Sequence, residues 1–335
     1  MNGSGNGKNG KSKFNKWIFL AALIVLLLGV SGYALRGYVS GALWGRPDGG
    51  GEPAVETDAA YGTAGPDEPA AGSGGQNAEV RNGESGGVQA GEKPEGTPFS
   101  ASGLPNTRHG WGLKRNSSHR QPEMPSSITA TLEKYGAYWI GSPGGKDLYL
   151  TFDEGYENGY TPKILDILKA NGVRAAFFVT GHYVKSQPDL VRRMVDEGHI
   201  VGNHTDTHPS LPDVSDAQIE RELRAVEQEF EKVTGRKGMK YLRPPQGEYS
   251  ERTLAVTRNL GYHNIFWSLA MVDWVPMPGG PQEAYDSVMG NLHNGALILL
   301  HAVSKDNTEA LDRILKDARA RGYTFKTLDD LVAGF

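Results

Sequence analysis

The sequence predicts an α/β fold in which parallel strands alternate with helices, preceded by an apolar N-terminal segment and a low-complexity linker. From residue 147 onward, short β-prone runs alternate with segments whose apolar residues have helical spacing. Repeated βα units of this length favour a parallel sheet or a barrel. Residues 17–35 form an uncharged apolar run, and residues 46–104 are rich in Gly, Ala, Pro, Glu and Ser.

The first 35 residues predict a cytoplasmic basic tail, residues 1–16, and a transmembrane anchor, residues 17–35. The tail contains four lysines and the anchor carries no charge. Nineteen residues at about 1.5 Å each span roughly 28 Å, close to the hydrocarbon thickness of a bilayer. The lysines place the N-terminus in the cytoplasm and the remainder outside the cell membrane. A cleaved signal peptide is the alternative, but Gly32-Tyr33-Ala34 is a poor cleavage site.

Residues 36–105 are predicted to be a disordered linker, because they bury too little apolar surface to offset backbone entropy. The linker would let the following domain, residues 106–335, search a layer near the membrane surface. The chain has no cysteine, which excludes disulfides and thiolate chemistry and suits a bacterial envelope. Its net charge is −4, without a basic stripe, so nucleic acid is not an expected partner. We expect a monomer.

The first elements of the domain follow from local composition. Residues 147–152 favour a strand because β-branched and aromatic residues suit a pleated surface. Residues 161–170 have helical apolar spacing, and residues 174–180 contain a buried strand of the type Ala-Ala-Phe-Phe-Val. A helix over 188–197 and a short strand over 199–203 complete this half.

The second half continues the alternation. Ser215 is a plausible N-cap for a long helix over 215–233. Strands are expected over 241–243 and 263–268, with a helix between them over 251–260. The last elements are then a buried strand over 296–300, a helix over 308–321 and a strand over 323–326.

Side chains of catalytic type follow the ends of the predicted strands. In chain order they are Asp153 and Glu154, His204 and His208, Arg243, Asp273 and Trp274, and His301. In βα barrels the C-terminal ends of the strands converge on one face, where active sites lie. We therefore expect these five groups to form one site.

The residue types of this set suit metal-assisted hydrolysis of an amide or ester. His204 and His208 share one face if their segment is helical. With a carboxylate they form a two-His, one-carboxylate site for zinc or another divalent ion that carries a water. The metal lowers the pKa of that water, and a second carboxylate serves as general base. A remote histidine held by Asp273 can protonate the leaving group.

The same segments resemble the ordered motifs of polysaccharide deacetylases with the NodB homology domain. The motifs are Thr151-Phe152-Asp153-Glu154-Gly155, His204-Thr205-Asp206-Thr207-His208, Arg243-Pro244-Pro245-Gln246-Gly247, Asp273-Trp274 and Leu299-Leu300-His301. The resemblance covers residues 147–330 and implies a distorted, incomplete (β/α) barrel of parallel strands with surrounding helices.

Longer stretches are similar to the delta-lactam-biosynthetic de-N-acetylase branch of this family. These are residues 152–161, residues 304–312 and the lead-in 111–114 with His119. The branch implies deacetylation of N-acetylmuramic acid in peptidoglycan glycan strands, a step toward muramic delta-lactam in the spore cortex. It places the domain in the bacterial envelope or the forespore intermembrane space. Deacetylation of N-acetylglucosamine polymers, or glycan binding without catalysis, are the alternatives.

The resemblance also implies a role for each matching residue. Asp153 would be the general base, Arg243 its ionic partner, and His301 the general acid tuned by Asp273. His204 and His208 would bind the metal. Trp274 and Leu299 would wall a pocket for the acetyl methyl group, and the Gln246 N–H would stabilise the oxyanion.

Two positions depart from the family pattern. The wider family has Asp at position 154 as third metal ligand, and the delta-lactam branch commonly has Asn. Glu154 leaves three options open: a two-His-plus-Glu site, a His–His site completed by waters, or no stable metal. Ala270 stands where many members carry a further Asp, and it has no expected catalytic role.

Overall fold

The computed structural model describes residues 101, 103–115 and 118–334 of the 335-residue chain. The predicted basic tail (1–16), the anchor (17–35) and almost all of the linker (36–105) lie outside these residues and stay predictions. Within the described part, no helix is both long and apolar enough to span a membrane.

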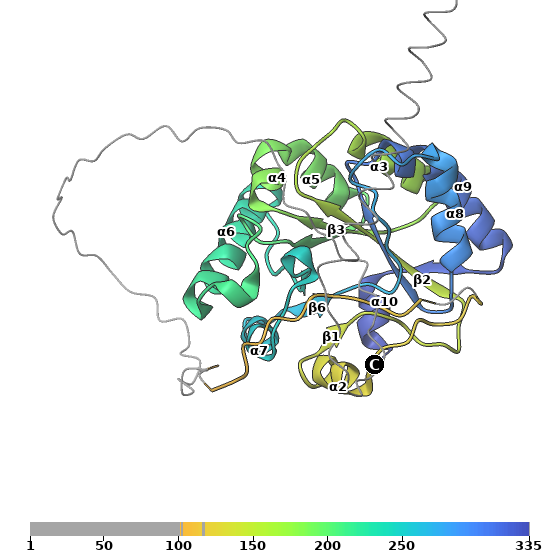
Figure 1. The fold of residues 1–335 in the computed structure, drawn as a ribbon. Helices are drawn as coiled ribbons and strands as arrows, with labels where there is room; N and C mark the ends of the chain where they lie inside the picture. The colour runs from red at the N-terminus through yellow and green to blue at the C-terminus, as the bar shows by residue number, and fades with distance from the viewer. Residues whose placement is uncertain (1–100, 102, 116–117, 335) are drawn as a thin grey trace, which may run out of the picture. The chain divides into compact units, whose positions relative to one another are not determined.

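An eight-stranded parallel sheet organises the described residues (Figure 1). Its strands are β1 (Ala137–Tyr138), β2 (Asp147–Glu154), β3 (Ala176–Val179), β4 (Ile200–Asn203), β5 (Tyr241–Leu242), β6 (His263–Ile265), β7 (Ala296–His301) and β8 (Thr324–Lys326). Their order is β1-β6-β5-β4-β3-β2-β7, and β8 pairs with the first residues of β2. Every pairing is parallel, which confirms the predicted parallel α/β fold.

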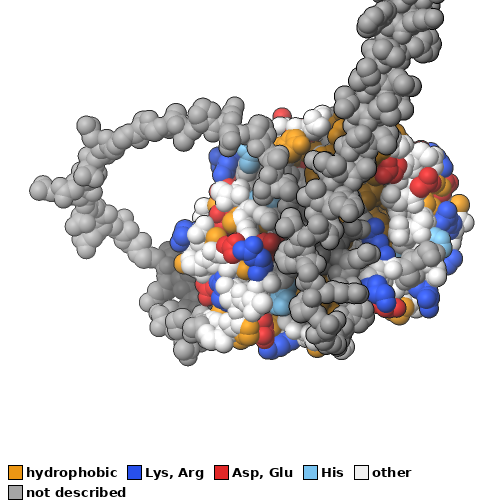
Figure 2. Space-filling model, viewed as in Figure 1, with side chains coloured by type: hydrophobic (Ala, Val, Ile, Leu, Met, Phe, Trp, Pro, Cys, Tyr) orange, Lys and Arg blue, Asp and Glu red, His pale blue; other side chains and the backbone are white. Residues whose placement is uncertain are grey.

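Helices surround this sheet in Figure 1. They are α2 (Ser126–Lys134), α3 (Thr161–Ala170), α4 (Gly181–Ser186), α5 (Pro188–Asp196), α6 (Asp216–Thr234), α7 (Glu251–Asn259), α8 (Gly280–Asn291), α9 (Lys305–Ala320) and α10 (Leu328–Ala333), with 3-10 turns η1 (Leu211–Asp213) and η2 (Pro245–Gly247). On the face shown in Figure 2, basic and acidic side chains of the described residues are interspersed.

The chain after β6 brings the two ends of the sheet together. Phe266 N–H donates to the Tyr138 carbonyl at the β1 end, with 2.8 Å between N and O. The Ser268 and Leu269 N–H groups donate to Leu297 of β7 at 2.9 and 3.2 Å. A short bridge of backbone hydrogen bonds therefore connects β7 to the β6 side of the sheet.

Alternation along β2 separates two apolar cores, because successive strand residues point to opposite faces. Leu148 and Phe152 belong to the larger core, which includes buried residues of α3, α4, α5, α6, α8 and α9. Tyr149 belongs to a second cluster with Phe178 of β3 and Leu299 of β7. The same alternation turns Asp153 toward the face of Tyr149, and Glu154 toward the helices.

Most predicted elements are confirmed with small shifts at their ends. Ser215 caps α6, accepting a hydrogen bond from the Gln218 N–H. Helix α9 begins at Lys305 rather than at 308, because the Ser304 side chain caps it. The strand predicted over 263–268 is β6 over three residues, since the following residues turn to form the bridge to β7.

Five elements were not predicted: α2, β1, α4, α8 and α10. Strand β1 has only two residues, and α4 and α10 have six each, too few for a periodic pattern. Helix α8 begins with Gly280-Pro281, a pair typical of a loop.

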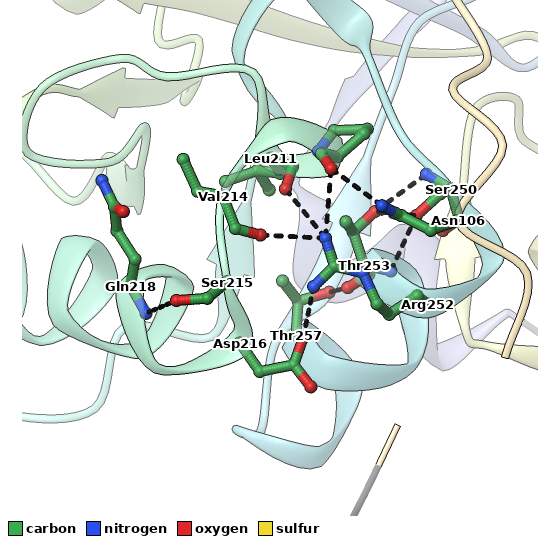
Figure 3. Close-up of polar contacts among 11 residues, drawn as sticks. Asn106, Leu211, Val214, Ser215, Asp216, Gln218, Ser250, Arg252, Thr253 and Thr257 are labelled. Atoms are coloured by element: carbon green, nitrogen blue, oxygen red, sulfur yellow. Dashed lines mark hydrogen bonds and ion pairs between the residues drawn. The ribbon is translucent and has the colours of Figure 1, made fainter. Parts of the chain in front are cut away.

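Arg252, in the first turn of α7, connects three segments far apart in the sequence (Figure 3). Its Nη2 donates to the carbonyls of Leu211 and Val214 at 3.4 and 2.9 Å, and its Nη1 pairs with Asp216. The Arg252 N–H donates to the carbonyl of Pro105. The loop between β4 and α6 is thus fixed to α7 and to residues 103–115, the segment before α2 that we call the N-terminal arm.

We expect Arg252→Met to lower the free energy of unfolding by about 2 kcal/mol, because partly buried carbonyls lose their charge-assisted donor. Urea denaturation followed by circular dichroism measures this change. Arg224→Met is the matched control, because it removes only an exposed ion pair with Glu220. Equal midpoints for the two variants would contradict the role given to Arg252.

Candidate active site

Asp153 and Arg243 form a buried ion pair where β2 and β5 end. Arg243 Nη1 donates to Asp153 Oδ1 at 2.7 Å, and its Nη2 donates to Thr151 Oγ1 at 2.8 Å. The guanidinium also donates to the backbone carbonyls of Ile265 and Phe266. Arg243 is fully buried, so these oxygens hold it in one orientation.

The ion pair keeps the Asp153 carboxylate charged. Burial alone would raise the pKa of Asp153, but the charge of Arg243 and its hydrogen bond to the carboxylate outweigh burial and bring that pKa below its usual value. With Oδ1 occupied by Arg243, the second oxygen, Oδ2, lies 3.6 Å from His204 Nε2. Asp153 is therefore an ionised acceptor that faces the histidines.

His204 and His208 lie side by side, with ring centroids 4.8 Å apart. His204 Nδ1 donates to the Arg243 carbonyl at 2.8 Å, which leaves the lone pair on Nε2. Burial lowers the pKa of His204, and burial followed by the neighbouring His204 lowers the pKa of His208 to about 3. Both shifts favour the neutral ring, which is the form that binds a metal.

The segment that carries the two histidines is a turn and not the helix on which the spacing argument relied. Thr205 and His208 have positive φ angles of 67° and 59°. The Thr207 N–H and hydroxyl both donate to the Glu222 carboxylate at 2.7 Å. A side chain on α6 therefore sets the turn that brings the rings together.

Glu154 is not brought to the histidines. Its carboxylate lies on the opposite face of β2, fully buried, with both oxygens 3.4 Å from Thr161 Oγ1 on α3. Burial, then the nearby Glu157, raises the pKa of Glu154 well above its usual value. The neutral acid that this favours is a poor metal ligand.

The donor set nearest to a metal site is therefore the histidine pair with Asp153 beside it. Among the described residues, no three His, Cys, Asp or Glu side chains form a ready metal-binding group. Two neutral imidazoles next to an ionised carboxylate nevertheless fit a divalent cation that keeps water in its remaining positions. Of the three options for position 154, this geometry favours a His–His site completed by waters.

His301 and Asp273 form a second hydrogen-bonded pair at the end of β7. His301 Nδ1 lies 2.6 Å from Asp273 Oδ1, and the His301 backbone N–H donates to Asp273 Oδ2 at 2.9 Å. Burial disfavours protonation of the ring, but the Asp273 carboxylate outweighs it and raises the pKa of His301. His301 is also the β-sheet neighbour of Asp153, so the predicted acid and base lie on adjacent strands.

The three predicted substrate contacts occupy the same end of the sheet. The Trp274 ring packs edge-on against His301, with centroids 5.2 Å apart. Leu299 is buried on the face of β7 that also carries His301. Gln246 follows Arg243 in η2 and has a φ of 60°, an uncommon conformation that persists where the surroundings enforce it.

Sequence reasoning missed several supporting residues. Thr151 contacts Arg243 and Asn307 contacts Asp273, whereas Glu222 contacts Thr207, in the turn between the two histidines. Trp111 stacks on Phe266 with centroids 4.3 Å apart, and its Nε1 donates to the Trp267 carbonyl. Trp111 and Asn307 lie in stretches that resemble the delta-lactam branch. Their positions in the sequence did not predict that Trp111 would contact Phe266 and Trp267, or that Asn307 would contact Asp273.

Comparison with known proteins agrees with the geometry. Residues 140–265 match the polysaccharide deacetylase family. The peptidoglycan-N-acetylmuramic acid deacetylase PdaA of Bacillus subtilis is 48% identical over 238 residues, which are 71% of this chain and 90% of that protein. The peptidoglycan-N-acetylglucosamine deacetylase of Bacillus cereus is 32% identical over 204 residues, 60% of this chain and 73% of that protein.

A solved structure supports the same relationship. The structure of Bacillus subtilis PdaA, described as a family 4 carbohydrate esterase, has a TM-score of 0.66 and 49% identity. The similarity covers 68% of this chain and 98% of that one. The resemblance inferred from the motifs is confirmed, and this chain belongs to the polysaccharide deacetylase family.

Proposed function

We propose that this protein hydrolyses the N-acetyl group of N-acetylmuramic acid in peptidoglycan, on the route to muramic delta-lactam. One observation carries the hydrolytic part: the ionised Asp153 faces two neutral histidines, while His301 is held by Asp273 on the adjacent strand. The 48% identity to the N-acetylmuramic acid deacetylase PdaA supports muramic acid as the sugar.

In this proposal Asp153 is the general base. Its lowered pKa keeps it ionised at neutral pH, so it can accept a proton from a water held on the side of Oδ2. The oxygen of that water adds to the acetyl carbonyl carbon. The Gln246 N–H stabilises the oxyanion that forms, a contribution of roughly 3 kcal/mol for one such donor.

His301 completes the reaction as general acid. Its raised pKa favours the imidazolium, which donates a proton to the sugar nitrogen as the carbon–nitrogen bond breaks. The products are acetate and a free amino sugar. Asp273 holds the ring through Nδ1 and leaves Nε2 for the transfer, and Trp274 with Leu299 would enclose the acetyl methyl group.

His204 and His208 would hold a divalent metal, zinc in this proposal. When bound, it supplies a water of lowered pKa and polarises the acetyl carbonyl. The hydrogen bond from His204 Nδ1 to the Arg243 carbonyl fixes the tautomer that directs Nε2 toward Asp153. Such outer contacts orient metal-binding histidines.

Deacetylation of N-acetylglucosamine polymers is the alternative activity, and similarity to the Bacillus cereus enzyme supports it. A glycan-binding protein without catalysis has less support, because a binder does not need an acid and a base on adjacent strands.

We further propose a monomer anchored by residues 17–35 in the cell membrane, with its domain outside and acting on glycan strands during spore-cortex synthesis. The uncharged run and the preceding lysines support the anchor. The bridge from Ser268 and Leu269 to β7 supports the description of the sheet as a distorted, incomplete barrel.

Mass spectrometry of muropeptides after treatment with the protein and zinc tests the substrate. We expect a loss of acetyl mass on the muramic residue, because the relative of higher identity acts on that sugar. Heat-inactivated protein is the control. Loss of acetyl from glucosamine alone would favour the alternative, and no acetate release with any divalent metal would contradict hydrolysis.

We expect Asp153→Asn to reduce kcat by about 10³-fold, the usual effect of losing a general base, and to retain metal binding. Acetate release and calorimetric zinc titration measure the two effects. Glu154→Gln, one residue away on the opposite face of β2, is the matched control and should leave zinc affinity unchanged. Normal turnover by Asp153→Asn would exclude it as the base.

The pH dependence should reveal the Asp273–His301 pair. Activity falls as pH rises through the pKa of His301, since the acid must be protonated, and Asp273 raises that pKa. Asp273→Asn should therefore move the alkaline limb of kcat/KM to lower pH, because the carboxylate that raises the pKa of His301 is lost. An unchanged limb would show that another group supplies the proton.

A further inference from the structure

We propose that Asn307 is a positioning residue for the general acid, acting through Asp273. This inference rests on the proposed function, because it gives Asn307 a task only if His301 protonates the leaving amine. The hydrogen bonds of Asn307 go to Ser304 and Asp273, and none joins it to His301 among the described residues. Its effect would pass through the carboxylate that both residues share.

The Asp273 carboxylate is buried and receives three N–H donors. Oδ1 accepts from His301 Nδ1, while Oδ2 accepts from the His301 backbone N–H and from Asn307 Nδ2. The backbone donor and the ring donor belong to one residue, so by themselves they hold Asp273 only from the β7 side. Asn307 holds Oδ2 from α9, and the carboxylate is thus fixed between two elements.

The orientation of the Asn307 amide has one consistent solution. A flipped amide would place Oδ1 against the Asp273 carboxylate, where two oxygen acceptors repel each other. Nδ2 is therefore the group that faces Asp273. The other end of the amide, Oδ1, is buried and has no hydrogen-bond partner among the described residues.

This unpaired oxygen distinguishes a functional role from simple packing. A buried carbonyl oxygen without a donor costs about 1–3 kcal/mol, and leucine would fill a similar volume without that cost. Asn307 is 1% exposed and lies among buried apolar residues of α9. An amide at this position offsets the cost of its unpaired oxygen only through the hydrogen bond from Nδ2 to Asp273.

The first turn of α9 supports the position of Asn307. The Asn307 N–H donates to the Ser304 hydroxyl, the N-cap of the helix, at 3.2 Å. One residue earlier, Asp306 accepts from the Met277 N–H at 3.0 Å. Two adjacent side chains of α9 therefore fix the loop that carries Asp273 and Trp274.

The protonation of His301 depends on the position of the loop that carries Asp273, because few charged groups lie near the His301 ring. The charged groups that act on His301 are Asp273, Asp153 and Arg243, and the Trp274 ring covers it from the side. Asp153 and Arg243 are held by each other. Asp273 is the partner whose orientation depends on a contact from another element, and Asn307 supplies that contact.

Asn307→Leu tests the inference, because leucine is similar in volume and lacks a donor. Without Nδ2, Asp273 can rotate away from His301. We expect kcat to fall about tenfold, as for other orienting partners, with KM within about twofold. The alkaline limb of kcat/KM should move to lower pH, in the direction expected for Asp273→Asn. Leucine could fail to fit and disturb the fold. Asn307→Ala also lacks the donor but is smaller, so it should move the alkaline limb in the same direction without a steric clash.

Thr308→Val is the matched control. Thr308 is also 1% exposed in the first turn of α9, and its hydroxyl donates to the Ser304 carbonyl and not to Asp273. It should change stability without moving the pH limb. If the wild-type protein is active and both Asn307 variants leave the limb in place, the positioning role is wrong. An inactive wild-type protein would instead contradict the proposed function.

Discussion

A fully buried guanidinium, that of Arg243, is the interaction on which the rest of the site depends. An unpaired charge in that position would cost several kcal/mol, so the surrounding chain must supply oxygens. It does so from Asp153 and Thr151 on β2, and from the backbone carbonyls of Ile265, the last residue of β6, and Phe266, which follows it. The carbonyl of Arg243 also accepts from His204. One residue therefore favours the charged form of Asp153, the proposed base, and fixes the tautomer of His204, which follows β4.

The alternation of a single strand assigns different environments to two adjacent acids. Asp153 is on the face of the guanidinium and is ionised, whereas Glu154 is on the helix face beside Glu157 and Thr161. The pKa values of two chemically similar side chains are therefore shifted in opposite directions, because a cation compensates the desolvation of one and only a hydroxyl faces the other. Since Glu154 lies on the face of β2 opposite to Asp153, its side chain does not enter the histidine pair.

The sequence was sufficient to predict the parallel α/β fold and the grouping of site residues, because strand composition and the C-terminal placement of reactive residues are local patterns. It was not sufficient to place Glu154, whose environment is formed by Thr161 on α3 and by the nearby Glu157. It also did not reveal Glu222, Asn307 or Trp111, because their contacts join segments far apart in the chain. The spacing of His204 and His208 places the rings on one face only if the segment is helical, and the structure brings them together through a turn with positive φ angles instead.

The N-terminal arm belongs to the same structural unit as the candidate active site, although it precedes the residues that match the family. The family match starts at residue 140, yet Trp111 lies against Phe266 and Trp267. Gly247, beside Gln246, also approaches it so closely that an added Cβ would come within 2.8 Å of Trp111 Cβ. Trp111 of the arm therefore packs against the turn that follows Arg243. A fragment that begins at residue 140 would lack Trp111, and chimaeras made from two relatives should take the arm and the parallel sheet from the same parent.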